Sequence, residues 1–308
     1  MNSLKSHFYI SSEVETALSK TLPVLALEST IIAHGMPYPE NIEFARQAET
    51  LVRKHGVTPA TIAIIDGKVH IGLNYEQLEI LSNSKNVEKI ATRDIAFAVA
   101  QKLTGATTVS ATMRLAHLAE INVFATGGIG GVHRNAETTF DISQDLIELS
   151  RTTMIVVSAG VKAILDIPKT LEYLETSAVP VIGYQTNEFP AFYSRSSGSK
   201  LTASCYTPVE IIKIFKAHRE LKLQSALLVA NPVPQSDEIP KNIMDKYIDA
   251  ALAGCIEKKI TGKAVTPFLL KRIVELSNEE SLKTNITLAL NNVKLGTQIA
   301  KQLSKIYV

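Results

Sequence analysis

Short apolar segments alternate with longer amphipathic segments along most of this chain. The short segments are rich in Val and Ile and apolar on both faces, which is typical of strands that are covered by helices on both sides. They predict strands at residues 24–27, 61–65, 69–71, 123–125, 154–157, 179–183 and 226–230. Asp66-Gly67 separates two of these segments and is a two-residue hairpin signal, so we expect a mixed sheet and not a purely parallel one.

The longer segments predict helices between the strands. They lie at residues 41–55, 94–103, 143–150, 168–176 and 207–221, and the pattern is almost wholly helical from Asn242 to the end of the chain. No repeat, low-complexity segment or long linker divides the sequence. We therefore expect a single domain over residues 1–308 with an α/β fold. The expected architecture is a three-layer α/β/α sandwich with a mixed, mostly buried β-sheet and a helical C-terminal part.

Composition narrows the classes of function. The chain has 308 residues, 45% of them hydrophobic, and a formal net charge of +2, so it lacks the basic excess of a protein that coats a nucleic-acid polymer. Two cysteines and no tryptophan argue against a disulfide framework, a Cys-only zinc site and stacking platforms for single strands. The N-terminus does not resemble a signal peptide, and no apolar run is long enough to cross a membrane. We expect a cytoplasmic protein.

Polar residues follow several of the predicted strands. Glu28, Thr126, Lys162, Gln185 and Asn231 stand at or near the carboxyl ends of apolar segments. Ligands of α/β sheets bind outside the carboxyl ends of the strands, so these positions predict one shared pocket. The alternative is that they are ordinary polar loops, which every sheet needs.

Lys162 and Glu28 are the candidates for covalent and acid chemistry. Lys162 follows a buried strand, and the pattern VKAILD predicts that it opens a helix. A lysine among apolar neighbours gives up its proton more readily than one in water, and a neutral amine can attack a carbonyl carbon to form a Schiff base. Glu28, at the end of VLALE, is suited to general acid catalysis. The alternatives are a solvated lysine in the first turn of a helix and a structural carboxylate that accepts loop amides.

Other candidates carry weaker signals. The Gly-rich segment 126–134 could let the backbone approach an anion such as a sugar phosphate, with His133 adding charge, or it could be a structural turn. Asp141 fits a helix N-cap, and with Asp145 one turn later it could instead hold a divalent cation. His34 is more easily interpreted as a loop histidine than as a ligand contact. Asn285 interrupts an apolar helix and suggests a hydrogen-bonding task.

Longer motifs add a family resemblance over about residue 10 to the C-terminus. In order they are ALESTIIAHGMPYPEN, IAIIDGKVHIGL, VEKIATRDI, GATTVSATM, FATGGIGGVHR, FDISQDL, SAGVKAILD, TLEYLET, NEFPAFYSRSSG, VANPVP and TNITLALNN. The chain resembles the pseudouridine-5'-phosphate glycosidases, an indigoidine synthase A-like family. The resemblance implies reversible cleavage of the carbon–carbon bond of pseudouridine 5'-phosphate to uracil and ribose 5-phosphate, by ring opening and a lysine Schiff base.

The resemblance also implies site residues and an assembly. It makes Glu28 the proton donor, Lys162 the nucleophile and Asp141 the ligand of one Mn²⁺, or another divalent cation, per subunit. It implies that the substrate contacts Lys89, Val109 (through its backbone), Ser143, Gln144, Asp145, Asn285, Thr126 and His133. Thr126 and His133 would lie near the phosphate. A homotrimer is implied as well, and we expect no fused kinase domain.

Two other classes of function stay open at this point. A sugar-phosphate aldolase would use the same lysine chemistry without any need to recognise uracil. A sugar-phosphate sensor that has lost its activity would keep the pocket, although it would need neither Glu28 nor Lys162. The direction of the reaction in the cell, the physiological metal and any role in pigment biosynthesis are not determined by the sequence.

Overall fold

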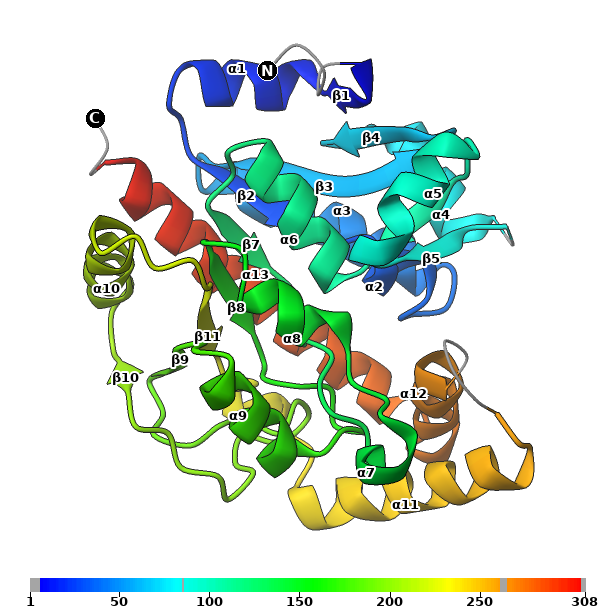
Figure 1. Ribbon diagram of the computed structural model, residues 1–308. Helices are drawn as coiled ribbons and strands as arrows, with labels where there is room; N and C mark the ends of the chain where they lie inside the picture. The colour runs from blue at the N-terminus through cyan, green and yellow to red at the C-terminus, as the bar shows by residue number, and fades with distance from the viewer. Residues whose placement is uncertain (1–5, 85, 261–264, 306–308) are drawn as a thin grey trace.

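A mixed sheet runs through the centre of the molecule (Figure 1). The computed structural model describes residues 6–84, 86–260 and 265–305. Its sheet has eleven strands, nine of them in the order β1-β4-β3-β2-β7-β8-β11-β9-β10, while β6 pairs with β3 and β5. The strands are β1 (Phe8–Ile10), β2 (Val24–Leu27), β3 (Thr58–Ile65), β4 (Lys68–Ile71), β5 (Glu88–Ile90), β6 (Gly105–Thr107), β7 (Val123–Ala125), β8 (Ile155–Ser158), β9 (Val181–Tyr184), β10 (Ser204–Cys205) and β11 (Leu227–Ala230).

The burial of the central strands explains why their sequences are apolar throughout. Every residue of β2, β7, β8 and β11 is buried, and neighbouring strands in this part of the sheet pair in parallel. Strands that are covered on both faces can be apolar throughout, without the alternation of a half-exposed sheet. The expected mixed α/β fold is confirmed.

The Asp66-Gly67 hairpin is also confirmed. β3 and β4 are antiparallel, with Ile65 opposite Lys68. Asp66 and Gly67 have φ values of 50° and 74°, and two successive positive φ angles are what a tight hairpin turn between twisted strands requires. A Cβ atom at Gly67 would lie 2.7 Å from the Cα of Lys102, so this position has no room for a side chain.

Helices cover both faces of the sheet. The larger ones are α1 (Ser12–Ser19), α3 (Glu40–Lys54), α4 (Tyr75–Asn83), α6 (Val109–Leu118), α9 (Ile167–Thr176), α10 (Pro208–Glu220), α11 (Lys241–Glu257), α12 (Val265–Leu276) and α13 (Glu280–Ser304), and the shorter ones are α2 (Thr30–Ala33), α5 (Ile95–Ala100), α7 (Ala136–Thr139) and α8 (Gln144–Leu149). In Figure 1, α6 and α8 lie in front of the sheet, whereas α3 and α13 lie behind it. The helical C-terminal part is confirmed by α11, α12 and α13. Within the described ranges, no helix combines the length and the apolarity needed to span a bilayer.

The pattern analysis missed several elements. Strands β1, β5, β6 and β10 have only two or three residues each, too few to show a period. Helix α6 was missed because Thr107, Thr108 and Val109 resemble a β-branched strand. Thr108 instead caps this helix, its hydroxyl accepting a hydrogen bond from the main-chain N–H of Ala111 at 3.5 Å.

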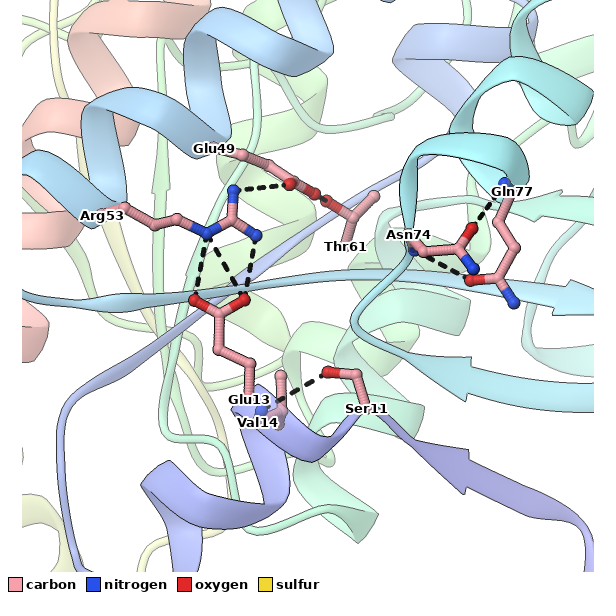
Figure 2. Close-up of polar contacts among 8 residues, drawn as sticks. All are labelled: Ser11, Glu13, Val14, Glu49, Arg53, Thr61, Asn74 and Gln77. Carbon is pink, nitrogen blue, oxygen red and sulfur yellow. Dashed lines mark hydrogen bonds and ion pairs between the residues drawn. The ribbon is translucent and has the colours of Figure 1, made fainter.

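A buried carboxylate ties α3 to the sheet and to α1 (Figure 2). Glu49 is 6% exposed and accepts hydrogen bonds from Thr61 at 2.7 Å and from Arg53 at 3.0 Å. Arg53 also donates to both oxygens of Glu13 on α1. Figure 2 also shows the caps of α1 and α4, where Ser11 accepts from the Val14 amide and a capping box joins Asn74 to Gln77.

The burial of Glu49 makes the stability of the fold depend on pH. Burial raises the pKa of Glu49 above its ordinary value of 4.5, although the hydrogen bond from Thr61 and the charge of Arg53 act in the opposite direction. The folded chain therefore holds this proton at pH values where the unfolded chain has lost it. The resulting stability is fully present below pH 4.5 and is lost as the pH rises through the raised folded pKa.

We expect Glu49→Gln to become less destabilising as the pH rises. The glutamine is neutral at every pH, whereas the wild-type chain must bury a charge at pH 7.5 that is partly neutralised at pH 5. Thermal unfolding at the two pH values measures the difference in melting temperature between the two proteins. Glu43→Gln, on the exposed face of the same helix, is the control and should show no such trend. A difference that is equal at both pH values would contradict this account.

Candidate active site

A cavity of about 280 Å³ lies at the carboxyl ends of the central strands. Glu28 directly follows β2, Gly127 and Gly128 follow β7, and Lys162 lies four residues beyond β8. All of them line this cavity, because β2, β7 and β8 are adjacent and parallel and therefore end at the same edge of the sheet. Gln185 after β9 and Asn231 after β11 do not line it. In particular, Asn231 after β11 turns to Asn292 on α13.

Glu28 is held in place by two hydroxyl groups. Its carboxylate is 5% exposed, and its two oxygens accept short hydrogen bonds from Thr30 and Thr126. Both threonines are themselves buried. The carboxyl group therefore has a fixed orientation at the wall of the cavity, which a proton donor needs in order to reach one atom of a ligand.

Lys162 does not open a helix, which corrects the expectation from the VKAILD pattern. Helix α9 begins only at Ile167, with Asp166 as its N-cap. Lys162 lies in the preceding turn, where its main-chain N–H donates to Ile129 at 3.0 Å. The side chain is partly buried, and its Nζ has no hydrogen bond or ion pair with another described residue. An amine with no carboxylate partner is available to react with a ligand.

The Gly-rich turn is fixed by Asp145. The N–H of Gly130 donates to one carboxylate oxygen of Asp145 at 2.7 Å, and the N–H of Ser110 donates to the other at 2.9 Å. A Cβ atom at Gly130 would lie 2.2 Å from the Oγ of Ser143, so only glycine fits. Asp145 thus joins the Gly-rich turn to the start of α6, and both of its oxygens are engaged with main-chain amides.

The expected capping role of Asp141 is wrong. Helix α8 starts at Gln144, and Ser143 caps it by accepting a hydrogen bond from the Asp145 amide at 3.2 Å. Asp141 lies outside the helix, with its carboxylate 3.8 Å from the Nδ1 of His133. Its side chain is 45% exposed and belongs to the wall of the cavity.

Positive charge gathers at the same wall. Burial lowers the pKa of His133 below its ordinary value; the carboxylate of Asp141 acts in the opposite direction, while Lys89 and Lys162 lower it further. His133 is therefore neutral near pH 7, so the positive charge at this wall comes from lysine and not from His133. Lys89 comes from the short strand β5, which pairs with β6 and thereby reaches the cavity.

Asp141 is the cavity carboxylate that a metal ion could reach most readily, since it is 45% exposed. Across residues 6–84, 86–260 and 265–305, no group of three His, Cys, Asp or Glu side chains is arranged to hold a metal. Asp141 faces the cavity, but Asp145 is occupied by amides. This donor set fits a hard divalent cation that takes one carboxylate and completes its shell with water and ligand oxygens, as Mg²⁺ and similar ions often do.

The structure brings most of the remaining predicted residues to the same cavity. Those that line it are Val109, Ser143, Gln144, Asp145 and Asn285. Val109 is the first residue of α6, where main-chain N–H groups have no intrahelical partner. Those of Ser110 and Ala111 donate to Asp145 and Thr108, which leaves the N–H of Val109 for a ligand. Gln144 accepts a hydrogen bond from the Arg93 amide at 3.1 Å. Thr126 is the exception, because it is not among the lining residues and its hydroxyl is bound to Glu28.

Sequence reasoning missed three contributions. His34, favoured above as an ordinary loop residue, lines the cavity, as do Thr266, Pro267 and Leu270 at the start of α12. The sequence holds no signal for the α12 contacts. Asn292 is 0% exposed and donates to the carbonyls of Thr126 and Gly127 at 2.8 and 3.1 Å. The Asn291-Asn292 pair in an apolar helix was the available signal for this role.

Comparisons of the sequence with known proteins all find one family. The profile of the family described as "Indigoidine synthase A like protein" matches residues 13–302. A pseudouridine-5'-phosphate glycosidase of Caldanaerobacter subterraneus is 54% identical, with 97% of each chain covered, and one of Staphylococcus aureus is 52% identical, covering 99% of this chain and 100% of its own.

Two solved structures also match over nearly the whole chain. An indigoidine synthase A-like protein of Thermotoga maritima superposes with a TM-score of 0.89 at 39% identity, over 96% of both chains. The prealnumycin C-glycosynthase AlnA, whose crystal structure contains ribulose 5-phosphate, has a TM-score of 0.90 at 37% identity, covering 97% of this chain and 98% of its own.

We expect Asn292→Ala to destabilise the protein by roughly 2–4 kcal/mol. The substitution leaves the Thr126 carbonyl and the side-chain amide of Asn231 without this partner, and the Gly127 carbonyl keeps only its bond from the Ala159 N–H. Each lost partner of a buried group costs on the order of 1–3 kcal/mol, not additively. Urea unfolding followed by circular dichroism measures the change. Asn291→Ala is the matched control, because Asn291 is only partly buried and makes one bond, to Pro232. Equal losses in the two variants would contradict the role given to Asn292.

Proposed function

This chain belongs to the family of indigoidine synthase A-like proteins, and we propose that it is a pseudouridine-5'-phosphate glycosidase. The observation that carries the proposal is the presence in one cavity of a fixed carboxyl group, Glu28, and an unpaired amine, Lys162. Relatives of that name that are about half identical over nearly the whole chain support it. The cavity is also close to the usual lower size of about 300 Å³ for small-molecule sites.

The bond that joins ribose to uracil in this substrate explains why an amine is needed. Ordinary glycosidases use two carboxyl groups, one of which protonates a leaving oxygen. In pseudouridine the leaving atom is a carbon with no lone pair to protonate, so a different route is required. The cavity has one carboxyl group fixed by hydroxyls and a lysine in place of a second one, which suits a Schiff-base route.

The proposed reaction balances with water as the only co-reactant. Glu28 gives its proton to the ring oxygen of the ribose as the bond between that oxygen and C1' breaks. The Nζ of Lys162 then bonds to C1' and passes a proton to the Glu28 carboxylate. Glu28 returns this proton to the uracil carbon as the carbon–carbon bond breaks, and the nitrogen lone pair forms the C=N bond of a protonated ribosyl imine. Water adds to this imine, which releases ribose 5-phosphate and the amine and gives the remaining proton back to Glu28.

The remaining lining residues have complementary charges for a nucleotide. Lys89 and the start of α6 at Val109 offer positive charge and N–H groups, which suit the phosphate. Ser143 and Gln144 would contact the sugar or phosphate, and His133 would hydrogen-bond there as a neutral ring. Thr126 and Asp145 would act mainly by holding Glu28 and the Gly-rich turn.

We also propose a divalent cation, of which Mn²⁺ is the one that the family resemblance suggests. Asp141 would hold it, with water and ligand oxygens completing the shell. Such an ion supplies positive charge that orders water and substrate oxygens. The chain's own residues carry out the proton transfer and the covalent step.

Three further properties are part of the proposal and rest on the family resemblance. The reaction is reversible, so the enzyme is classed either as a hydrolase or as a lyase according to the direction in which it is used. The working form is a homotrimer in the cytoplasm. Sedimentation velocity on the purified protein measures its mass and checks the trimer directly.

Sodium borohydride, added with ribose 5-phosphate, should attach the reduced sugar phosphate to Lys162. Borohydride reduces an imine to a stable amine, and peptide mass spectrometry locates the modified residue. Lys162→Ala should show no such adduct and should lose release of uracil from pseudouridine 5'-phosphate, assayed with added Mn²⁺. Lys169→Ala, an exposed lysine paired with Glu137, is the control and should keep both. Full turnover by Lys162→Ala would overturn the mechanism, and imine formation without uracil release would favour an aldolase.

Glu28→Gln should reduce the turnover number by about 10²–10⁴-fold, which is the usual contribution of a positioned acid. Substrate binding should change much less, because the amide keeps the shape and can still bond with Thr30 and Thr126. Steady-state kinetics and equilibrium binding separate the two effects. Thr126→Val should give a smaller fall in turnover, since it loosens Glu28 without removing the proton. A large loss of binding with normal turnover would assign Glu28 to binding instead.

A further inference from the structure

Two buried polar atoms lack any hydrogen-bond partner within the described part of the chain. They are the Nε2 of His34 and the Oδ1 of Asn285. Buried side-chain polar atoms are almost always hydrogen-bonded, and each exception calls for an explanation. Both residues line the cavity described above, although they come from distant parts of the sequence. Their coincidence at one site points to a ligand that supplies the missing partners.

The His34 ring presents a lone pair to the cavity. His34 follows the short helix α2, and burial lowers the pKa of its ring, while a hydrogen bond to the main-chain carbonyl of Glu88 acts in the opposite direction. The ring is therefore neutral near pH 7 and has one N–H. Because Nε2 has no partner, Nδ1 is the nitrogen that serves Glu88. This network assigns the proton to Nδ1 and leaves Nε2 as an acceptor.

Asn285 presents a second acceptor from the other side of the site. It lies on α13, is 6% exposed, and its Oδ1 would be 3.7 Å from a Cβ atom built on Gly127. The Cδ1 of Ile31, three residues before His34, would lie 3.4 Å from the same point. An apolar side chain and a bare glycine therefore lie beside this acceptor. Such a surface accommodates the face of a flat ring.

The chemistry of these atoms excludes a phosphate as their partner. Phosphate oxygens are acceptors and need donors, which Lys89 and the start of α6 offer elsewhere in the cavity. Two unpaired acceptors need a ligand with two donors. A neutral ring with two N–H groups meets this need.

We propose that His34 and Asn285 accept the two ring N–H groups of a uracil that is joined to ribose through carbon. In such a nucleotide both ring nitrogens carry hydrogen, because the glycosidic bond leaves from a carbon. In an N-linked uracil nucleotide one nitrogen forms the glycosidic bond and has no hydrogen. One of the two acceptors would then stay buried and unpaired, which disfavours binding. This inference rests on the proposed function and assigns its selectivity for the carbon-linked isomer to these two residues.

Methylation of the ligand, one nitrogen at a time, tests the pair. The probes are pseudouridine 5'-phosphate and its N1-methyl and N3-methyl derivatives, titrated calorimetrically into the Lys162→Ala protein, which does not turn them over. Each methyl group removes one donor, so both derivatives should bind roughly 10-fold to 100-fold more weakly than the parent. His34→Ala, added to this background, should bind the parent at least 10-fold more weakly. It should no longer discriminate against one of the two derivatives.

Asn285→Ala should lose discrimination against the other derivative. His34→Gln keeps an acceptor near the position of Nε2 and should retain most of the discrimination, so it serves as a second variant if His34→Ala folds poorly. His117→Ala is the matched control, because this histidine is exposed near the far end of α6. It should bind all three ligands as the parent protein does.

The outcomes separate this inference from the proposed function. The assignment of the two acceptors is overturned if His34→Ala still discriminates fully against both derivatives. It is also overturned if His34→Ala and Asn285→Ala both lose discrimination against the same derivative. Uracil release by the wild-type protein in those cases would leave the proposed function standing. If the wild-type protein neither releases uracil nor binds pseudouridine 5'-phosphate, both proposals fail together.

Discussion

The parallel pairing of β2, β7 and β8 is the constraint on which the site depends. Neighbouring strands lie about 4.8 Å apart, so the residues that follow three adjacent parallel strands meet within roughly 10 Å. Glu28, the Gly-rich turn and the turn that holds Lys162 follow these strands. An acid and an amine that are 134 positions apart in the sequence thereby face one cavity. A change in strand order would separate them, whatever the loops contained.

Hydrogen bonds from side chains to the main chain then fix the loops at this edge. Asp145 binds the amides of Gly130 and Ser110, and Asn292 binds the carbonyls of Thr126 and Gly127. These loop groups are outside the sheet ladder, so buried side chains must satisfy them. The same bonds position Thr126 against Glu28. The Asp145 carboxylate and the Asn292 amide therefore also determine where Glu28 and the Gly-rich turn lie.

The lining of the cavity differs from the rest of the core in how its polar groups are satisfied. Glu49, which does not line this cavity, is buried with Thr61 and Arg53 as partners. Lys162, His34 and Asn285 instead keep atoms that have no hydrogen-bond partner in the described part of the chain. Such groups weaken the empty fold, but a ligand that pairs with them recovers the loss on binding. A carboxyl group, an amine and unpaired acceptors within one cavity would suit the proposed reaction, which needs an acid, a nucleophile and recognition of a flat ring together.

The sequence by itself determined the class of fold and much of the chemistry. The apolar segments of the central strands, the Asp66-Gly67 hairpin and the C-terminal helices follow from local patterns, because burial on both faces and turn geometry restrict residue types directly. Long motifs located the main site residues through a family resemblance. Only the tertiary structure decided that Lys162 lies in a turn, that Ser143 and not Asp141 caps α8, and that Thr126 holds Glu28. It alone left the Nε2 of His34 without a partner among the described residues. These features depend on which distant groups are near enough to share a hydrogen bond, and neither spacing nor composition contains that distance.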